Sequence, residues 1–184
     1  MTQYILSNKE MEKADLLTIE SGISSLDLMF NAGKKVFDNL PIQKGKRALF
    51  ICGPGNNGGD GYVAADLLLK QGMEIDIYCP INKAKESNDN LYYKQKLNDS
   101  LFVTKIKNVS NYCYVVDALF GTGLSRSMSD DLISLVNNIN QSKLDVYSVD
   151  IPSGINGDTS TIFGGAFKAS KTITFFNKKK CHYL

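Results

Sequence analysis

Short apolar runs alternate with amphipathic stretches along most of this chain. The run at residues 47–52 is apolar without alternation, which is typical of a strand buried on both faces of a parallel sheet. Similar runs predict further strands at 75–79, 101–103, 112–117, 146–149 and 172–176.

Helical spacing fills the intervals around these strands. Ser7 and Glu10 match a capping box and predict a first helix over 7–22, and a second helix is expected over 24–37. Later helices are predicted at 62–71, at 82–100 with a polar surface, and at 130–140.

The repeated order of strand and helix predicts the fold class. We expect an α/β fold, a three-layer α/β/α Rossmann-like sandwich with a mostly parallel central sheet and an N-terminal helical pair. Because neither an internal repeat nor a linker interrupts the pattern, residues 1–184 are expected to form one domain. Ligands of such sheets bind beyond the carboxyl ends of the strands, so the functional residues should follow Cys52, Asp117 and Asp150.

Composition narrows the class of protein. Of 184 residues, 43% are apolar and 22% are charged, as in globular proteins, and a net charge of +2 weighs against nucleic-acid binding. No apolar stretch reaches the roughly 20 residues of a membrane span, and the N-terminus lacks the apolar core of a signal peptide. The four cysteines form no CxxC pair, which disfavours zinc and suggests free thiols in a reducing compartment. A cytoplasmic protein is therefore expected.

Residues 53–61 form a glycine-rich segment after the first predicted strand. Gly53, Gly55 and Gly58 satisfy G-x-G-x-x-G, which is a weak signal by itself. A dehydrogenase would also need an acidic residue where the second strand ends, and that strand ends at Cys79. An ordinary NAD-binding domain is therefore disfavoured.

A P-loop kinase is disfavoured too, because Gly59 and Asp60 stand where its lysine and its serine or threonine are required. Asn56, Asn57 and Asp60 nevertheless carry oxygens suited to hydroxyl groups or to a hard cation, and the following helix directs its positive end at this segment. The simpler alternative is a tight turn in which Asp60 caps the helix.

The loops after two later strands also carry chemistry. Asp117 and Asp150 each end an apolar strand, where an unpaired charge is costly. Arg126 suits a phosphate group, although a solvated arginine is an equal alternative. Together with Ser153, the two aspartates would form a cluster of oxygen ligands for a group 1 or group 2 cation.

Together the three loops closely resemble those of the YjeF N-terminal-domain family, the NAD(P)HX epimerases. The resemblance rests on G-P-G-N-N-G-G-D-G at 53–61, D-A-L-F-G-T-G-L at 117–124 and V-D-I-P-S-G at 149–154, and it extends over nearly the whole chain. It implies an isomerase that interconverts the R and S hydrates of NADH and NADPH, which are its small-molecule substrates. It also implies a functional partner, the NAD(P)HX dehydratase, which restores only the S form.

The resemblance implies roles for individual residues. The substrate contacts would come from all three loops: Asn56, Asn57, Gly58, Gly59, Asp60, Gly121, Thr122, Gly123, Leu124, Ser125, Arg126, Ser127 and Asp150. One potassium ion per subunit would be bound by Asn57, Asp117 and Ser153.

Asp150 is the expected acid/base. The ring nitrogen can expel the hydroxyl group from the neighbouring carbon and leave an iminium ion. A carboxylic acid can protonate the departing oxygen, and as a carboxylate it can then activate the returning water and stabilise the cationic ring.

The chain departs from the family pattern at Phe30, where a glutamate is usual, and after the last predicted strand, where the family usually continues. We expect the lysines at 178–180 to form a solvated tail, and we expect the one histidine, His182, to take no part in catalysis. The apolar faces of the N-terminal helical pair favour a homodimer.

The alternative function is a non-catalytic binding or scaffold domain with the same fold. Loss of the loop aspartates would favour that alternative, but Asp60, Asp117 and Asp150 are all present.

Overall fold

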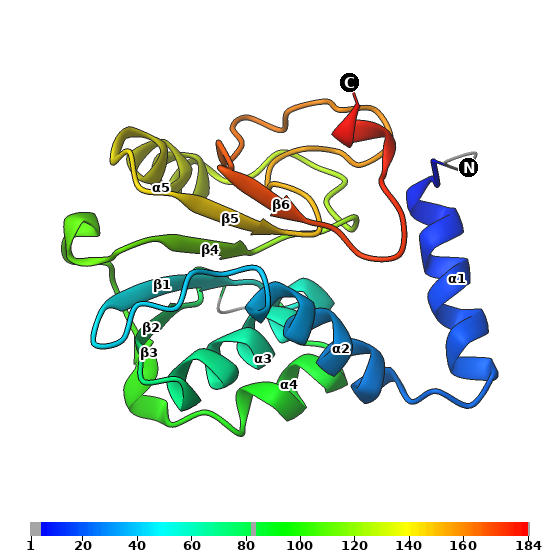
Figure 1. The fold of residues 1–184 in the computed structure, drawn as a ribbon. Helices are drawn as coiled ribbons and strands as arrows, with labels where there is room; N and C mark the ends of the chain where they lie inside the picture. Colours follow the sequence, from blue (N-terminus) through cyan, green and yellow to red (C-terminus); the bar gives the residue numbers. More distant parts are fainter. Residues whose placement is uncertain (1–4, 82–83, 184) are drawn as a thin grey trace.

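The computed structural model describes residues 5–81 and 84–183, and across these residues six strands form one sheet in the order β3-β2-β1-β4-β5-β6 (Figure 1). Each neighbouring pair runs parallel. The strands are β1 (Arg47–Cys52), β2 (Glu74–Tyr78), β3 (Phe102–Val103), β4 (Val115–Ala118), β5 (Val146–Val149) and β6 (Lys171–Ile173). The predicted parallel sheet is confirmed.

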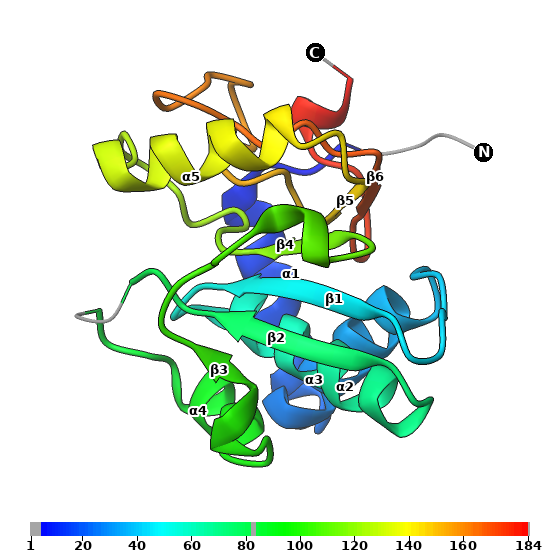
Figure 2. The ribbon, with the colours of Figure 1, turned by 90° about the vertical axis from the view of Figure 1, so that its left-hand side faces the viewer.

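Helices cover both faces of this sheet. The helices are α1 (Asn8–Glu20), α2 (Ser25–Phe37), α3 (Asn56–Lys70), α4 (Asn88–Lys94) and α5 (Asp130–Gln141). Figures 1 and 2 show α2, α3 and α4 on one face and α5 on the other. The predicted three-layer α/β/α sandwich is therefore confirmed.

The central strand β1 shows why its sequence does not alternate. Phe50 belongs to the apolar cluster that includes Tyr62 of α3, whereas Leu49 and Ile51 belong to the cluster that includes Val136 of α5. Because helices cover both faces of β1, the residues that point to one face and those that point to the other must all be apolar, and the sequence does not alternate.

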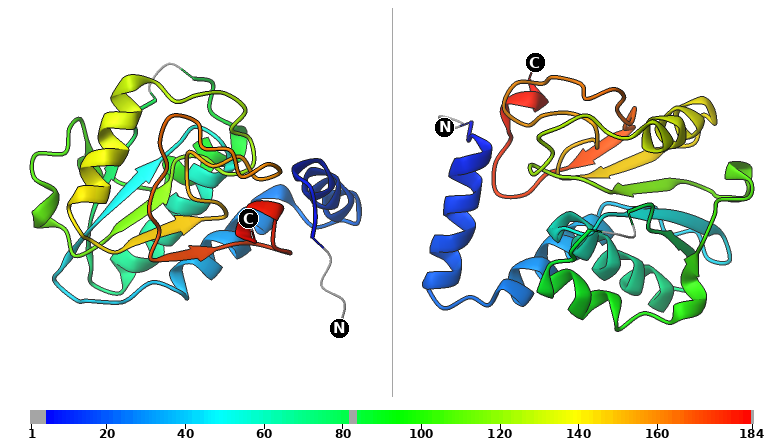
Figure 3. Two further views of the ribbon diagram at one scale, coloured as in Figure 1. Left: turned by 90° about the horizontal axis from the view of Figure 1, so that it is seen from above. Right: turned by 180° about the vertical axis from the view of Figure 1, so that it is seen from behind.

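Helix α1 lies outside the three layers, beside the C-terminal segment (Figures 1 and 3). Ser7 and Glu10 form the predicted capping box. Within this helix Met11 is the buried residue, while Leu16 and Leu17 are 60% and 54% exposed. The two predicted N-terminal helices are present, but it is α2 that packs on the sheet layer: at Gly33 of α2, an added Cβ would collide with Val63 of α3.

Several predicted boundaries are wrong, among them the start of the strand predicted over 112–117, which begins at Val115. Helix α3 begins at Asn56 rather than at residue 62, so most of the glycine-rich segment forms its first turns, and Gly55 is the N-cap. The helix predicted over 82–100 is limited to α4, and residues 82 and 83 lie outside the described residues. The last strand stops at Ile173, because the chain turns there toward the site.

Among the described residues, no helix is both long and apolar enough to cross a membrane.

Candidate active site

The segments that follow β1, β4 and β5 are joined at the carboxyl edge of the sheet. After β1, the Gly53 amide donates to the Ala118 carbonyl, and a side chain at Gly53 would collide with the carbonyl of Leu119. After β4, the Phe120 amide donates to the Ser153 hydroxyl over 2.8 Å. The structure thus brings together the three loops that the sequence singles out, beside the point where the strand order reverses.

Asp117 lies at the centre of this edge and is fully buried. Its Oδ1 accepts hydrogen bonds from the Ser153 hydroxyl at 2.6 Å and the Leu119 amide at 3.3 Å. Its Oδ2 accepts from the Ser153 amide and the Ser148 hydroxyl, both at 2.8 Å. Burial raises the pKa of Asp117 to about 6, although these four hydrogen bonds act in the opposite direction.

Asn57, Gly121 and Asp150 meet at the same edge of the sheet. A Cβ atom added at Gly121 would lie 3.2 Å from Asn57 Oδ1 and 3.3 Å from Asp150 Oδ2. The Asn57 Nδ2 atom is buried without a hydrogen-bond partner among the described residues. An unpartnered buried amide is costly, so this amide can bind a ligand between the two glycine segments, residues 53–61 and 121–123.

Asp60 adds a second carboxyl group on the first turns of α3. It is buried, and burial followed by the nearby Asp150 and Asp15 raises its pKa well above the ordinary value. Burial and the charge of Asp150 also raise the pKa of Asp15 on α1. The raised pKa favours the acid form of Asp60. The simpler alternative, in which Asp60 caps the helix, is wrong, because Gly55 is the N-cap.

Asp150 follows β5 in an unusual backbone conformation. Its φ is +63°, and the Ile151 amide donates to the Val149 carbonyl across it, which makes a three-residue γ-turn of the rarer hand. Positive φ is uncommon in a residue other than glycine, and aspartate is among those that tolerate it best. The turn directs the carboxylate toward Gly121.

A lysine from the C-terminal segment holds this carboxylate. Lys179 Nζ lies 2.5 Å from Asp150 Oδ1, and Lys179 is 1% exposed. Thr174 donates to the same Oδ1 over 3.1 Å. The expected solvated tail is therefore wrong at its middle residue, although Lys178 and Lys180 are exposed.

His182 also reaches Asp150, through the backbone. The Lys179 amide donates to His182 Nδ1 over 2.9 Å, so Nε2 carries the proton and donates to the Asp150 carbonyl at 3.0 Å. Burial lowers the pKa of His182, which favours the neutral ring that this arrangement needs. The histidine supports the turn and makes no contact of its own with the Asp150 carboxylate.

The rest of the second loop lies farther out. Leu124 is buried, whereas the neighbouring Ser125, Arg126 and Ser127 are exposed. No ion pair involves Arg126 in the part of the chain that the structure describes. Its guanidinium group is therefore available to a ligand, as the predicted phosphate contact requires. The loop is tied to α1, because Asn8 Nδ2 donates to the Thr122 carbonyl.

Several residues that support the site could not be singled out from the sequence. Asn90 of α4 is fully buried, and its Nδ2 donates to the carbonyls of Gly53 and Gly55 over 3.1 and 2.8 Å. Ser87 donates to Asn56 over 2.8 Å. These residues stand in a polar stretch whose composition predicts a surface, so no local signal indicated that they hold the glycine segment.

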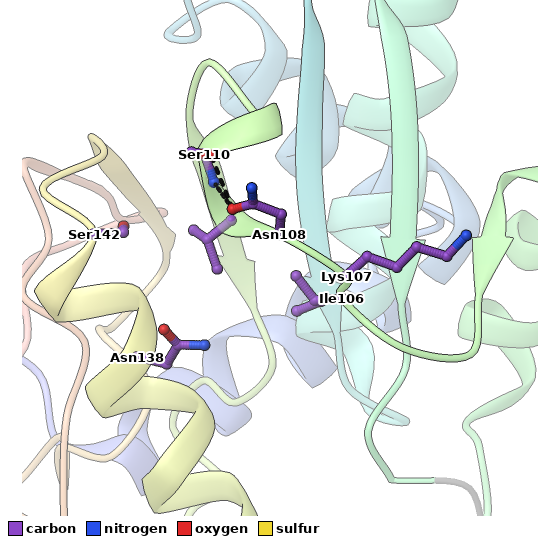
Figure 4. Close-up of a pocket in the computed structure, with 7 residues that line it drawn as sticks. Ile106, Lys107, Asn108, Ser110, Asn138 and Ser142 are labelled. Atoms are coloured by element: carbon purple, nitrogen blue, oxygen red, sulfur yellow. Dashed lines mark hydrogen bonds between the residues drawn. The ribbon is translucent and has the colours of Figure 1, made fainter.

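A cavity of about 380 Å³ lies elsewhere (Figure 4). It is lined by Ile106, Asn108, Ser110, Asn138 and Ser142, among others. These residues precede β4 and β5, so the cavity is at the amino edge of the sheet and does not belong to the site.

The donor atoms around Asp117 suit a group 1 cation. Asn57, Asp117, Ser153 and the Phe120 carbonyl, which lies 3.1 Å from Ser153 Oγ, supply only oxygen. The hydrogen bonds to Asp117 come from neutral donors, so its buried negative charge lacks a counter-charge among the described residues. No cluster of three or more histidine, cysteine, aspartate or glutamate residues suited to a metal is present among those residues.

The fold and site define a class: a parallel α/β domain with buried aspartates and a glycine-rich helix start where the strand order reverses. Residues 25–181 match the family described as YjeF-related protein N-terminus. The chain belongs to this family.

Known proteins of this kind resemble the chain over most of its length. A protein of Lentilactobacillus buchneri named NAD(P)H-hydrate epimerase is 37% identical, over 95% of this chain and 83% of its own. A bifunctional NAD(P)H-hydrate repair enzyme Nnr of Moorella thermoacetica is 32% identical, over 94% of this chain and 36% of its own. The crystal structure of yeast ynu0, YNL200c, superposes with a TM-score of 0.81 at 25% identity, covering 97% of this chain and 83% of that one.

Proposed function

We propose that this protein is an NAD(P)H-hydrate epimerase, an isomerase that interconverts the R and S hydrates of NADH and NADPH. The observation that carries the proposal is the meeting of Asn57, Gly121 and Asp150 at the carboxyl edge of the sheet. Relatives that carry this name match nearly the whole chain, which supports the same activity here. A scaffold function would not require an unpartnered buried amide beside a free carboxylate oxygen.

Asp150 would carry the acid/base step. Its carboxylate faces the space beside Gly121, where the hydrated ring would sit. Departure of the hydroxyl group needs a proton, and its return needs a base on water, and one carboxyl group can serve both because the reaction is its own reverse. The carboxylate would also stabilise the iminium ion between the two steps.

The glycine segments would hold the rest of the dinucleotide. The first turn of α3 presents backbone amides and the positive end of the helix dipole at Asn56 and Asn57, which suits a phosphate or a ribose hydroxyl. Exposed Arg126 would meet a phosphate group at the outer end of the second loop.

A potassium ion bound by Asn57, Asp117 and Ser153 would supply positive charge beneath the substrate. Asp117 and Ser153 join the second loop to the third, so the same ligands would keep these loops in register. The ion would not be the only link between the two loops, because Ser153 already joins Asp117 to Phe120 by hydrogen bonds.

A dehydratase that consumes the S hydrate is the expected functional partner, and the bifunctional names of longer relatives support this pairing. A homodimer through the exposed apolar residues of α1, among them Leu16 and Leu17, remains part of the proposal. So does a cytoplasmic location, which the four free cysteines support.

The decisive assay uses mixed R and S hydrates with excess S-specific dehydratase. If the proposal is correct, adding this protein converts the slow consumption of the R form into a fast one. Consumption of the R form at its spontaneous rate, by a folded protein in potassium buffer, would instead favour the scaffold alternative.

A further inference from the structure

We propose that Lys179 is the positioning residue of the active site: it holds the Asp150 carboxylate by one oxygen and leaves the other for the substrate. The inference rests on the proposed function, since it assigns a task within the same site. It concerns a lysine that the sequence alone does not distinguish from its two neighbours.

The ammonium group of Lys179 is fully engaged. Its three protons are matched by three acceptors: Asp150 Oδ1 at 2.5 Å, Thr174 Oγ1 at 2.8 Å and the Phe175 carbonyl at 3.2 Å. With 1% of its surface exposed and no donor left over, Lys179 has nothing to offer a ligand. It acts through Asp150 and is not itself a substrate contact.

The two oxygens of Asp150 are consequently different. Oδ1 accepts from Lys179 and from Thr174, both in the C-terminal segment. Oδ2 lies next to the backbone of Gly121, and within the described ranges 5–81 and 84–183 no hydrogen bond reaches it. The only oxygen free for acid/base chemistry therefore points between the glycine segments.

The position of Lys179 is secured from both sides. Leu6 and Lys179 form a parallel bridge, and the Lys179 amide donates to His182, which in turn donates to the Asp150 carbonyl. The chain after β6 thus acts as a strap that carries one ammonium group to one carboxylate.

Charge explains why the site needs this lysine. Asp15 of α1 and Asp60 of α3 both interact with Asp150, and its charge contributes to the raised pKa of each. The groups that face Asp150 from the C-terminal segment are Lys179, Cys181 and His182, and among them Lys179 is the cation. Without Lys179, the Asp150 carboxylate would stand beside two other carboxyl groups and would lose the cation that faces it.

A buried ion pair is not by itself a sign of function, because such pairs often contribute little to stability. The test therefore compares Lys179→Met, which keeps length and removes charge, with Lys179→Arg, which keeps charge. Lys180→Met, at the exposed next position, is the matched control.

The first readout is the pH profile of epimerisation. In Lys179→Met we expect kcat to fall about 100-fold with KM nearly unchanged, and the acid limb of the profile to move up by about one pH unit or more. Lys179→Arg should restore the position of the acid limb, and Lys180→Met should match the wild type. A wild-type profile in Lys179→Met, or a KM effect alone, would overturn the inference.

The second readout needs no turnover. The Asp150 carboxylate, labelled with carbon-13 and assigned through Asp150→Asn, should titrate at higher pH in Lys179→Met than in the wild type and in Lys179→Arg. If Lys179→Met does not fold, the wild type and Lys179→Arg must share one Asp150 titration, and any other result contradicts the inference. An inactive wild type would end the proposed function, whereas an unchanged titration would end only the role of Lys179.

Discussion

The hydroxyl group of Ser153 donates a 2.6 Å hydrogen bond to Asp117 Oδ1 and so joins the loop after β5 to the end of β4. The backbone amide of the same serine donates to the other oxygen of Asp117 over 2.8 Å. One buried carboxylate thus receives two hydrogen bonds from one residue, which fixes the turn that carries Asp150 three positions earlier. The geometry of the proposed acid/base depends on this joint.

Asp117 predicts a particular dependence of stability on pH. Because burial raises its pKa from 3.8 to about 6, the folded protein binds this proton more tightly than the unfolded chain. Its contribution to stability is fully present below about pH 4 and is lost as the pH rises through about 6, a change on the order of 3 kcal/mol. Urea denaturation over this range should show that decline in the wild type and not in Asp117→Asn. Equal slopes for both proteins would contradict it.

Potassium should reverse that loss. A cation bound by Asn57, Asp117 and Ser153 binds the folded state only, so it should raise Tm by a few degrees near pH 8 and by less near pH 5, where Asp117 is protonated. Melting curves in potassium and lithium chloride at equal concentration provide the measurement. Ser153→Ala should abolish the difference between the two salts. If the wild type melts identically in both, the ion has another site or none.

Asp150→Asn should remove most of the activity and little of the stability. The amide cannot exchange a proton with the hydroxyl group, so we expect epimerisation to fall by about 100- to 10,000-fold. The coupled assay with S-specific dehydratase measures the rate, and circular dichroism checks the fold. Asp131→Asn, an exposed aspartate on α5, is the control and should behave as the wild type. Near wild-type turnover in Asp150→Asn would remove this residue from the mechanism.

Gly121 should tolerate no side chain, while Gly123, two residues along, should tolerate one. A methyl group at Gly121 would lie between Asn57 and Asp150, where substrate must approach, whereas nothing lies within 4 Å of the same group at Gly123. We expect kcat/KM of Gly121→Ala to fall by about tenfold or more, because the reacting groups are displaced by a fraction of an ångström. Gly123→Ala, which adds its methyl group to open space, should lose clearly less kcat/KM than Gly121→Ala. Similar kinetics for the two variants would place the substrate elsewhere.

Asn90→Ala should destabilise the glycine segment at 53–61, which Asn90 of α4 holds by hydrogen bonds to its carbonyls. The change leaves the buried carbonyl of Gly53 and the more exposed carbonyl of Gly55 without their donor, which should cost about 1–3 kcal/mol in the free energy of unfolding. Chemical denaturation measures the loss, and Asn88→Ala, at an exposed position of the same helix, should cost less than about 1 kcal/mol. Equal small losses in both variants would show that Asn90 does not hold the segment.

Much of the fold follows from local pattern. The apolar runs predict each strand of the sheet to within a few residues, since most residues of a strand covered on both faces are apolar. The start of α3 was missed because glycine and asparagine are poor helix formers. There the helix is held by Asn90 and by the close approach of Gly53 to Leu119, neither of which a local window contains.

The residues of the site also divide into those that the local sequence indicates and those that only long-range packing distinguishes. Asp60, Asp117 and Asp150 could be singled out from the sequence, because acidic residues beside glycines at the ends of apolar strands are unusual and parallel strands deliver them to one edge. Lys179 could not, because three consecutive lysines are alike in every local property. Burial distinguishes the middle one, and burial arises only where the chain after β6 turns back past Leu6 and meets Asp150. Residue type and order thus determine which groups can do chemistry, whereas long-range packing determines which charge stands beside them.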